Sequence, residues 1–230
     1  MLSTMQKVSC IIPVYNEGPR IKNVLSIVAG HPLIHEVLVV DDGSTDETTT
    51  MVREFARVQL ILHSTNKGKT QAIMTGVAKA TGELLLLLDG DLVGLTPHDL
   101  TRVINPVLVG DADTSISLRK NSPWIDRVIG VDIFSGERVF PQTLIQGHVP
   151  EILCLPRFGF ESYLNTLIIQ NNYRIKIVPW NTVVSPWKYQ KKGFVRGIIA
   201  DFFMIVDILR TISVFQVLYQ FKKLRSLRVT

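Results

Sequence analysis

The chain has 230 residues, 46% of them hydrophobic, and a formal net charge of +5. This composition excludes a disordered chain and suffices for one sizeable core, so we expect one main domain with a short extension rather than two domains. Cys10 and Cys154 lack the spacing of a zinc or redox motif, and no secretory signal precedes them. We therefore expect a reducing, cytoplasmic setting.

The first ninety residues alternate apolar runs with helix-like segments. The predicted strands are short runs of β-branched residues or leucines, at 8–14, 36–40, 58–62 and 83–88. The predicted helices lie between them, at 20–29, 48–58 and 70–80. Thr81-Gly82 is expected to close the last helix in a left-handed conformation. This alternation predicts an α/β fold with a mostly parallel sheet flanked by helices.

The second half is less regular. Thr96-Pro97 is a good helix start, with proline in the first turn. Residues 111–150 give no clear periodicity, whereas 161–170 predict a helix and 173–179 alternate like a strand.

The C-terminal tail combines apolar and basic residues. Residues 194–221 are apolar on almost every side of a helical projection, and charges at Asp201, Asp207 and Arg210 disfavour a simple membrane span. Basic residues flank this stretch on both sides: Lys188, Lys191, Lys192 and Arg196 before it, and Lys222, Lys223, Arg225 and Arg228 after it. This layout fits a helix on an anionic membrane surface, or one packed on a partner. Nucleic acid is disfavoured, because base-stacking aromatic residues are not interleaved with the early basic ones.

Polar clusters follow three of the predicted strands: Tyr15-Asn16-Glu17, Asp41-Asp42 and Asp89-Gly90-Asp91. Ligands of parallel α/β sheets gather at these carboxyl ends. The two carboxylates of the third cluster could hold Mg²⁺ or Mn²⁺, which would neutralise charge on a departing diphosphate, or they could simply form a turn. Asp42 could accept a hydrogen bond from a base or ribose, while Asp41 and Ser44 are as well explained by the turn and the following helix start.

Seven segments carry a family resemblance: IIPVYNE (11–17), VVDDGSTD (39–46), NKGKTQAI (66–73), ATGELLLLLDGDL (80–92), SLR (117–119), SGERVF (135–140) and GFESYLN (159–165). In this order and spacing, they resemble the family 2 glycosyltransferases with the GT-A fold over residues 7–190. The resemblance is nearest to the polyprenyl-phosphate, or dolichyl-phosphate-type, sugar transferases.

The resemblance implies a site for a nucleoside-diphosphate sugar and a divalent metal, Mg²⁺ or Mn²⁺. It places the donor against Pro13, Tyr15, Asn16, Glu17, Asp42, Lys69 and Asp89. The metal ligands it implies are Asp89 and Asp91, with Asp91 the surer of the two. The position of a further glutamine ligand in the lipid-phosphate enzymes is Val93 here, and 185–194 contains no late histidine ligand. Water or donor oxygens would complete the coordination.

The resemblance also implies an acceptor site. Arg119 and Arg138 match arginines that hold an acceptor phosphate, a role suited to the guanidinium fork. Alternatively, one of them forms a structural ion pair with Asp113, Asp126 or Glu137. Glu161 would be the general base for a hydroxyl acceptor, whereas a phosphate acceptor needs none. It is also explained as a carboxylate at a helix start.

We therefore expect a GT-A domain over 1–190 and a helical extension over 191–230 that could lie at a membrane interface. The expected activity is inverting, metal-dependent transfer, with Asp91 and Glu161 as catalytic residues and polyprenyl phosphate as acceptor. The enzyme would be peripheral on the cytoplasmic face of the membrane and could form a homo-oligomer. The alternatives are transfer to a saccharide or lipid-linked glycan, and a non-catalytic nucleotide-sugar-binding subunit. A dehydrogenase is disfavoured because GxGxxG is absent after the first strand.

Overall fold

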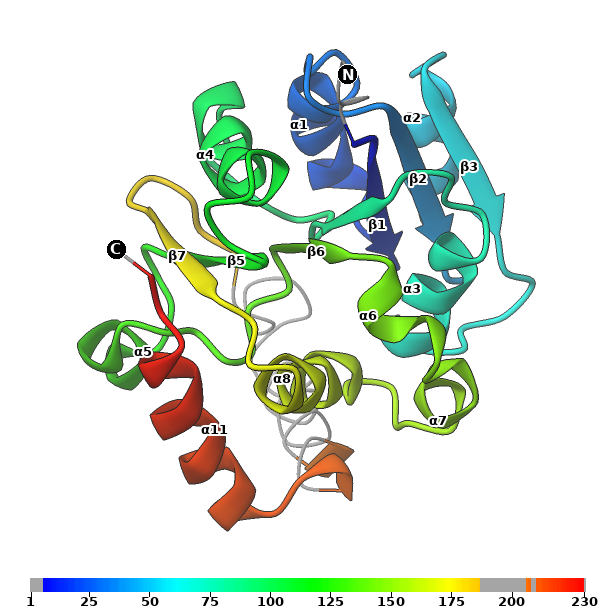
Figure 1. Cartoon of the computed structure of the whole chain (residues 1–230). Coiled ribbons are helices and arrows are strands. Elements are labelled where there is room, and N and C mark those ends of the chain that lie inside the picture. The colour runs from blue at the N-terminus through cyan, green and yellow to red at the C-terminus, as the bar shows by residue number, and fades with distance from the viewer. Residues whose placement is uncertain (1–5, 187–205, 208–209, 230) are drawn as a thin grey trace.

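A seven-stranded sheet organises the chain in the computed structural model, which describes residues 6–186, 206–207 and 210–229 (Figure 1). The strands, in chain order, are β1 (Val8–Val14), β2 (Glu36–Asp41), β3 (Val58–Leu62), β4 (Leu84–Leu87), β5 (Thr114–Arg119), β6 (Arg138–Pro141) and β7 (Ile175–Trp180). Their order across the sheet is β3-β2-β1-β4-β6-β5-β7. Every neighbouring pair is parallel except those of β6, which is antiparallel to β4 and β5. The predicted mostly parallel sheet is confirmed.

Helices cover both faces of this sheet. One face carries α1 (Gly18–Val28), α2 (Thr48–Arg53) and α4 (Pro97–Leu108); the other carries α3 (Lys69–Val77), α6 (Thr143–Gln146), α7 (Val149–Leu153), α8 (Phe160–Gln170) and α11 (Val214–Ser226). Alternate leucines of β4 enter the two cores, Leu84 and Leu86 on the first face and Leu85 and Leu87 on the second. A strand buried on both sides explains the continuous leucine run.

Two helix boundaries illustrate how local sequence sets the elements. Thr96 caps α4 through a reciprocal capping box with Asp99, as its sequence predicts. The prediction of a left-handed Gly82 is wrong, because α3 ends at Val77 and the positive-φ glycines of the described chain do not include Gly82. Gly82 is needed instead for close approach, since a Cβ there would lie 2.5 Å from the Lys7 carbonyl oxygen.

The C-terminal helix α11 packs against α8. Leu224 is fully buried, and Gln220 donates a hydrogen bond to the Ser162 carbonyl of α8 at 2.9 Å. The chain then returns to the sheet, where Arg228 forms a parallel bridge with Ile175 at the edge strand β7 (Figure 1). No helix in the described ranges is both long enough and apolar enough to cross a bilayer. The first part of the apolar tail, 194–205, lies outside the described residues, and the predicted boundary near residue 190 stays a prediction.

Candidate functional site

The loops after β1 and β2 are joined by reciprocal hydrogen bonds. Asn16 has a left-handed backbone, with φ of 56°, a conformation that asparagine tolerates. Its N–H donates to Ser44 Oγ at 2.9 Å, and its Oδ1 accepts from the Thr45 N–H at 2.8 Å. The Glu17 N–H donates to Thr48 Oγ1 at 2.8 Å. The cluster Tyr15-Asn16-Glu17 is thus held against the loop that carries Asp41 and Asp42.

Asp41 has a structural role at this edge. Its Oδ1 accepts from the Ser44 N–H at 2.8 Å, and its Oδ2 accepts from Thr49 Oγ1 at 2.5 Å. Asp41 and Ser44 thus build the turn before α2, but neither caps the helix, which begins at Thr48 after Glu47.

Asp42 anchors the loop that begins α3. Its Oδ1 accepts from the Lys67 N–H at 2.8 Å and lies 2.7 Å from His63 Nδ1, while its Oδ2 accepts from the Gly68 N–H at 2.7 Å. The carboxylate is almost fully buried. A carboxylate oxygen has room for about two hydrogen bonds, and the contact of Oδ2 with a base or ribose stays a prediction. No motif in the sequence indicates the contact between His63 and Asp42.

The segment between α7 and α8 docks on the start of α3. The Thr70 N–H donates to the Arg157 carbonyl at 3.0 Å, and the Gln71 amide donates to the Leu153 carbonyl at 2.7 Å. Gly68, with φ of 97°, lies so close that a Cβ atom would be 2.5 Å from Arg157 Cγ. This contact brings the first turns of α3 and α8 together.

Lys69, in the first turn of α3, bridges two of the predicted site carboxylates. Its Nζ lies 2.8 Å from Asp89 Oδ1 and 2.7 Å from Glu161 Oε1. Burial alone would lower the pKa of Lys69, but the charges of Asp89 and Glu161 outweigh it and raise the pKa above its ordinary value. The lysine is therefore a fixed positive charge between the triplet Asp89-Gly90-Asp91 and the predicted base.

Gly136 closes over this ion pair. A Cβ atom at Gly136 would lie 2.7 Å from Asp89 Oδ1 and 2.8 Å from Lys69 Nζ, so only a glycine leaves the space next to the carboxylate open. Asp89 already accepts a positive group, the Lys69 ammonium, and carboxylate oxygens are the hard donors that Mg²⁺ and Mn²⁺ prefer, so the residues present fit either ion. The described residues contain no group of three or more His, Cys, Asp or Glu side chains placed to hold a metal. Donor oxygens or water would therefore have to contribute ligands.

Asp91, the second carboxylate of the triplet, is 6% exposed. Its Oδ2 accepts a hydrogen bond from Ser185 Oγ at 2.9 Å. Ser185 follows β7, the last strand of the sheet, and no motif in the sequence indicated that it would reach the triplet.

Arg119, at the end of β5, is surrounded by carboxylates. Its Nη1 lies 3.0 Å from Glu137 Oε1 and 3.8 Å from Asp89 Oδ2, and its Nη2 lies 3.6 Å from Asp132 Oδ2. Burial would lower the pKa of Arg119, but these carboxylates raise it, so the guanidinium stays charged. The alternative of an ion pair with Glu137 is confirmed for Arg119, and its contact with Asp89 places it at the site as well.

Arg138 is fully buried. Its Nε donates to the Ser135 carbonyl at 2.9 Å, and its Nη1 donates to Asn165 Oδ1 at 3.0 Å. These bonds tie the loop before β6 to α8, and none of the guanidinium is exposed. Its contact with an acceptor phosphate stays a prediction, one that requires this part of the site to open.

Asp126 is a further buried carboxyl group near Arg119, on α5 (Trp124–Ile129). Its Oδ2 has no hydrogen-bond partner within the part of the chain that the structure describes. Burial, reinforced by the charge of Asp132, raises the pKa of Asp126 to about 7, although Arg119 opposes the shift.

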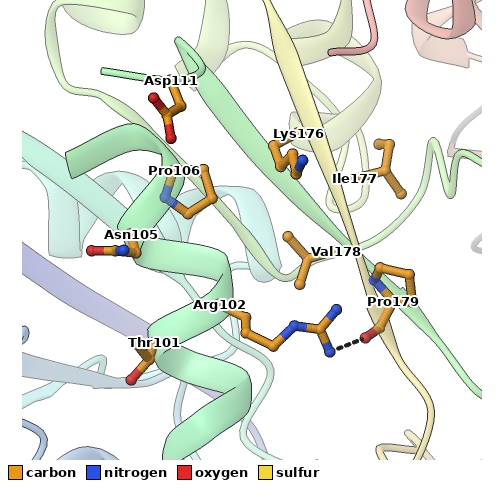
Figure 2. A pocket seen from close by; sticks show the side chains of 9 residues that line it. All are labelled: Thr101, Arg102, Asn105, Pro106, Asp111, Lys176, Ile177, Val178 and Pro179. Carbon is orange, nitrogen blue, oxygen red and sulfur yellow. Dashed lines mark hydrogen bonds between the residues drawn. The ribbon is translucent and has the colours of Figure 1, made fainter. Parts of the chain in front are cut away.

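A surface depression of about 510 Å³ lies elsewhere, between α4 and β7 (Figure 2). Arg102 crosses it and donates to the Pro179 carbonyl at 3.0 Å. Its other lining residues include Asp111 and Lys176, but none of the predicted site residues. This depression is therefore separate from the candidate site.

The part of the sequence that forms these loops matches a protein-family model. The model of "Glycosyl transferase family 2" matches residues 9–151, more than half of the chain. The chain belongs to glycosyl transferase family 2. Within this family-2 chain, the match covers every strand from β1 to β6 and the triplet Asp89-Gly90-Asp91.

Curated relatives of this family-2 chain include polyprenyl-phosphate sugar transferases. Dodecaprenyl-phosphate galacturonate synthase of Rhizobium johnstonii is 29% identical over 124 residues, covering 50% of this chain and 36% of the relative. Undecaprenyl-phosphate 4-deoxy-4-formamido-L-arabinose transferase of an Enterobacter species is 34% identical over 112 residues, covering 45% and 34%. The aligned part is about a third of the length of these relatives.

Solved structures establish the GT-A fold. Glucosyl-3-phosphoglycerate synthase of Mycobacterium tuberculosis, in complex with Mn²⁺, UDP and glucosyl-3-phosphoglycerate, superposes with a TM-score of 0.69 over 90% of this chain and 80% of that one. The same enzyme with Mg²⁺ and UDP gives 0.67. At 18% identity, the likeness concerns the fold.

The predicted site residues thus fall into three groups. Lys69, Asp89, Glu161 and Arg119 are directly connected, and Asp91 lies at the same strand end. Asn16, Glu17 and Asp42 belong to the neighbouring loop network, next to Pro13 in β1 and Tyr15 directly after it, whereas Arg138 is fully buried. Sequence reasoning did not anticipate the contacts of Gly136 and Ser185. Gly136 and Ser185 affect the site because they lie close to its side chains in the folded chain, and the chemistry of a sequence motif does not reveal such proximity.

Proposed function

We propose that this family-2 chain transfers a sugar from a nucleoside-diphosphate sugar to a polyprenyl phosphate, with inversion at the anomeric carbon. The observation that carries the proposal is the bridge of Lys69 between Asp89 and Glu161, with Arg119 on the other oxygen of Asp89. The positive groups of Lys69 and Arg119, which suit a phosphate, thus lie next to carboxylates. Asp89 suits a metal, and Glu161 suits an acceptor.

On the donor side, the proposed roles follow from these contacts. Asp89 and Asp91 would hold Mg²⁺ or Mn²⁺, which would supply Lewis-acid stabilisation of the leaving diphosphate. Lys69, whose ammonium contacts Asp89, would stabilise the charge that develops on the same phosphates. Asp42, which fixes Gly68 and hence the start of α3, would orient the nucleotide through its remaining acceptor position. Pro13, Tyr15 and the loop of Asn16 and Glu17 would line the nucleotide.

On the acceptor side, Arg119 would receive the phosphate. The guanidinium is charged, 14% of the Arg119 side chain is exposed, and the group would exchange a carboxylate partner for the phosphate. The acceptor oxygen would bond to the anomeric carbon as the bond to the diphosphate breaks, so one step inverts the centre. A phosphate acceptor is already anionic, and Glu161 would then act with Lys69 to position groups rather than remove a proton.

Apolar surface near this arginine favours a lipid acceptor. Trp124 and Val128, one turn apart on α5, are each 74% exposed. The segment before α5 is linked to the end of β5, because the Ser122 N–H donates a hydrogen bond to the Arg119 carbonyl. On α11, Phe215, Leu218 and Tyr219 are also exposed, next to Lys222 and Lys223. We propose that these surfaces meet an anionic membrane on its cytoplasmic side, with residues 191–230 as the membrane-facing extension.

A second candidate is transfer to a hydroxyl of a saccharide or lipid-linked glycan. The buried position of Glu161, next to Asp89 through Lys69, favours it, because such an acceptor needs a base there. A panel of nucleotide-sugars, each with Mn²⁺ or Mg²⁺, offered to polyprenyl phosphate and to free saccharides, separates the candidates. A glycolipid product supports the lipid-phosphate acceptor, transfer only to saccharides supports the second candidate, and binding without transfer indicates a non-catalytic subunit.

A further inference from the structure

We infer that Ser185, held in place by Asn121, is a positioning residue for the metal-binding carboxylate of Asp91. The inference rests on the proposed function, since it assigns this residue to the proposed metal site. Its starting point is the hydrogen bond from Ser185 Oγ to Asp91 Oδ2, 2.9 Å long. A serine hydroxyl is a neutral donor, so it fixes a carboxylate without removing its charge.

Ser185 is itself clamped by a side-chain amide. Asn121 Nδ2 donates to the Ser185 carbonyl at 2.7 Å, and Asn121 Oδ1 accepts from the Ser185 N–H at 3.3 Å. The side chain of a single asparagine therefore binds both the backbone N–H and the backbone carbonyl of Ser185, as a neighbouring strand would. Asn121 lies two residues after Arg119. The orientation of Asp91 is consequently linked to the loop of the proposed acceptor arginine.

The segment before Ser185 is fixed on both sides. Val184 and Val93 exchange two backbone hydrogen bonds, of 2.9 and 3.0 Å, just after the triplet. The Lys120 N–H donates to the Val183 carbonyl at 3.1 Å, and the Val183 side chain is fully buried. A segment so anchored cannot shift to follow a mobile carboxylate. It therefore defines where the hydroxyl lies, and the hydroxyl selects one orientation of Asp91.

Loss of such a partner weakens metal binding by about 10- to 100-fold in characterised metal sites. We expect Ser185→Ala to weaken Mn²⁺ binding to this extent, and Ser185→Thr, which keeps a hydroxyl, to restore most of it. Asn121→Ala should have a smaller effect in the same direction. The matched control is Thr182→Ala, in the same segment, whose hydroxyl donates to the Gly94 carbonyl at 3.4 Å rather than to the triplet.

The test is a titration of the full chain with Mn²⁺. The electron paramagnetic resonance signal of free Mn²⁺ measures how much of the metal is unbound at each step. It is run with whichever of UDP, GDP or ADP gives the tightest binding to the unsubstituted chain. Thermal unfolding of each variant in the absence of metal shows that the fold is intact. The expected result is weaker Mn²⁺ binding by Ser185→Ala but not by Thr182→Ala, at unchanged melting temperature.

Two results would overturn the inference and are distinguishable. If the unsubstituted chain binds Mn²⁺ and Ser185→Ala binds it equally well, the positioning role of Ser185 fails while the proposed function stands. If the unsubstituted chain binds no Mn²⁺ with any of the three nucleotides, the proposed metal-dependent function fails, and the role of Ser185 fails with it.

Discussion

Lys69 and Glu161 meet through a 2.7 Å contact between the ammonium Nζ and the carboxylate Oε1, although they belong to different helices, α3 and α8. The same ammonium contacts Asp89. Removal of Lys69 would therefore leave two carboxylates facing each other and take a positive charge from the proposed donor site.

We expect Lys69→Met to reduce transfer by about 100-fold or more, a typical cost of losing one group that stabilises charge on a leaving group. Steady-state kinetics with the donor identified in the panel measures this loss. Lys67→Ala is the matched control, because that exposed side chain is two residues away and only its backbone N–H holds Asp42. Equal activity of Lys69→Met and Lys67→Ala would contradict the role of Lys69.

Gly136→Ala should inactivate the site without unfolding the chain. The added Cβ would crowd Asp89 Oδ1 and Lys69 Nζ, which are ends of side chains and can move aside at little cost in stability. We expect lower transfer and weaker Mn²⁺ binding with a melting temperature close to that of the unsubstituted chain. Gly147→Ala, where a Cβ meets nothing within 4 Å, should change neither property. A fully active Gly136→Ala would show that the site does not need this open space.

The buried carboxyl of Asp126 predicts a pH dependence of stability. Its pKa is about 7 in the folded chain, against an ordinary value of 3.8, chiefly because of burial. Between about pH 4 and pH 7, the folded chain retains a proton that the unfolded chain has released, so this group's stabilising contribution falls as pH rises.

Asp126→Asn removes this titration. We expect the free energy of unfolding of the variant to increase steadily, relative to that of the unsubstituted chain, from pH 5 to pH 7.5. Urea unfolding at several pH values measures it. Parallel stability curves for the two proteins would contradict the assignment.

The outer face of α11 predicts binding to anionic membranes. It combines the exposed Phe215 and Leu218 with Lys222 and Lys223 one to two turns later, and residues 211–230 contain no Asp or Glu. We expect Phe215→Ser with Leu218→Ser to reduce co-sedimentation with phosphatidylglycerol-containing vesicles, and added salt to weaken binding of the unsubstituted chain. Val109→Ser, at an exposed valine after α4, is the control. Undiminished co-sedimentation of the double variant would exclude α11 as the membrane contact.

The sequence predicts the first half of the fold well because its signals are local. The strands β1, β2, β3 and β4 are runs of mainly apolar residues, and polar residues follow each run. By contrast, β5, β6 and α5 fall in a stretch without clear periodicity. There the antiparallel β6 pairs with two strands distant in sequence, a contact that local patterns do not encode.

The candidate site, like the fold, has residues that the sequence predicts and residues that it does not. Motif residues such as Asp89 and Glu161 are predictable because their chemistry recurs at a fixed position after a strand or at a helix start. Ser185 and Gly136 act through a hydroxyl or through the absence of a side chain, and only the folded chain reveals what lies next to them. Arg138 illustrates the converse, since a motif position does not reveal that its guanidinium is fully buried.

The central claim is that Asp89 and Asp91 serve metal-dependent sugar transfer. Its most direct test is the panel of nucleotide-sugars with polyprenyl phosphate, run on the unsubstituted chain and on Asp91→Ala, with and without Mn²⁺. We predict a glycolipid product that requires both the metal and Asp91. Full metal-dependent transfer by Asp91→Ala would contradict the claim.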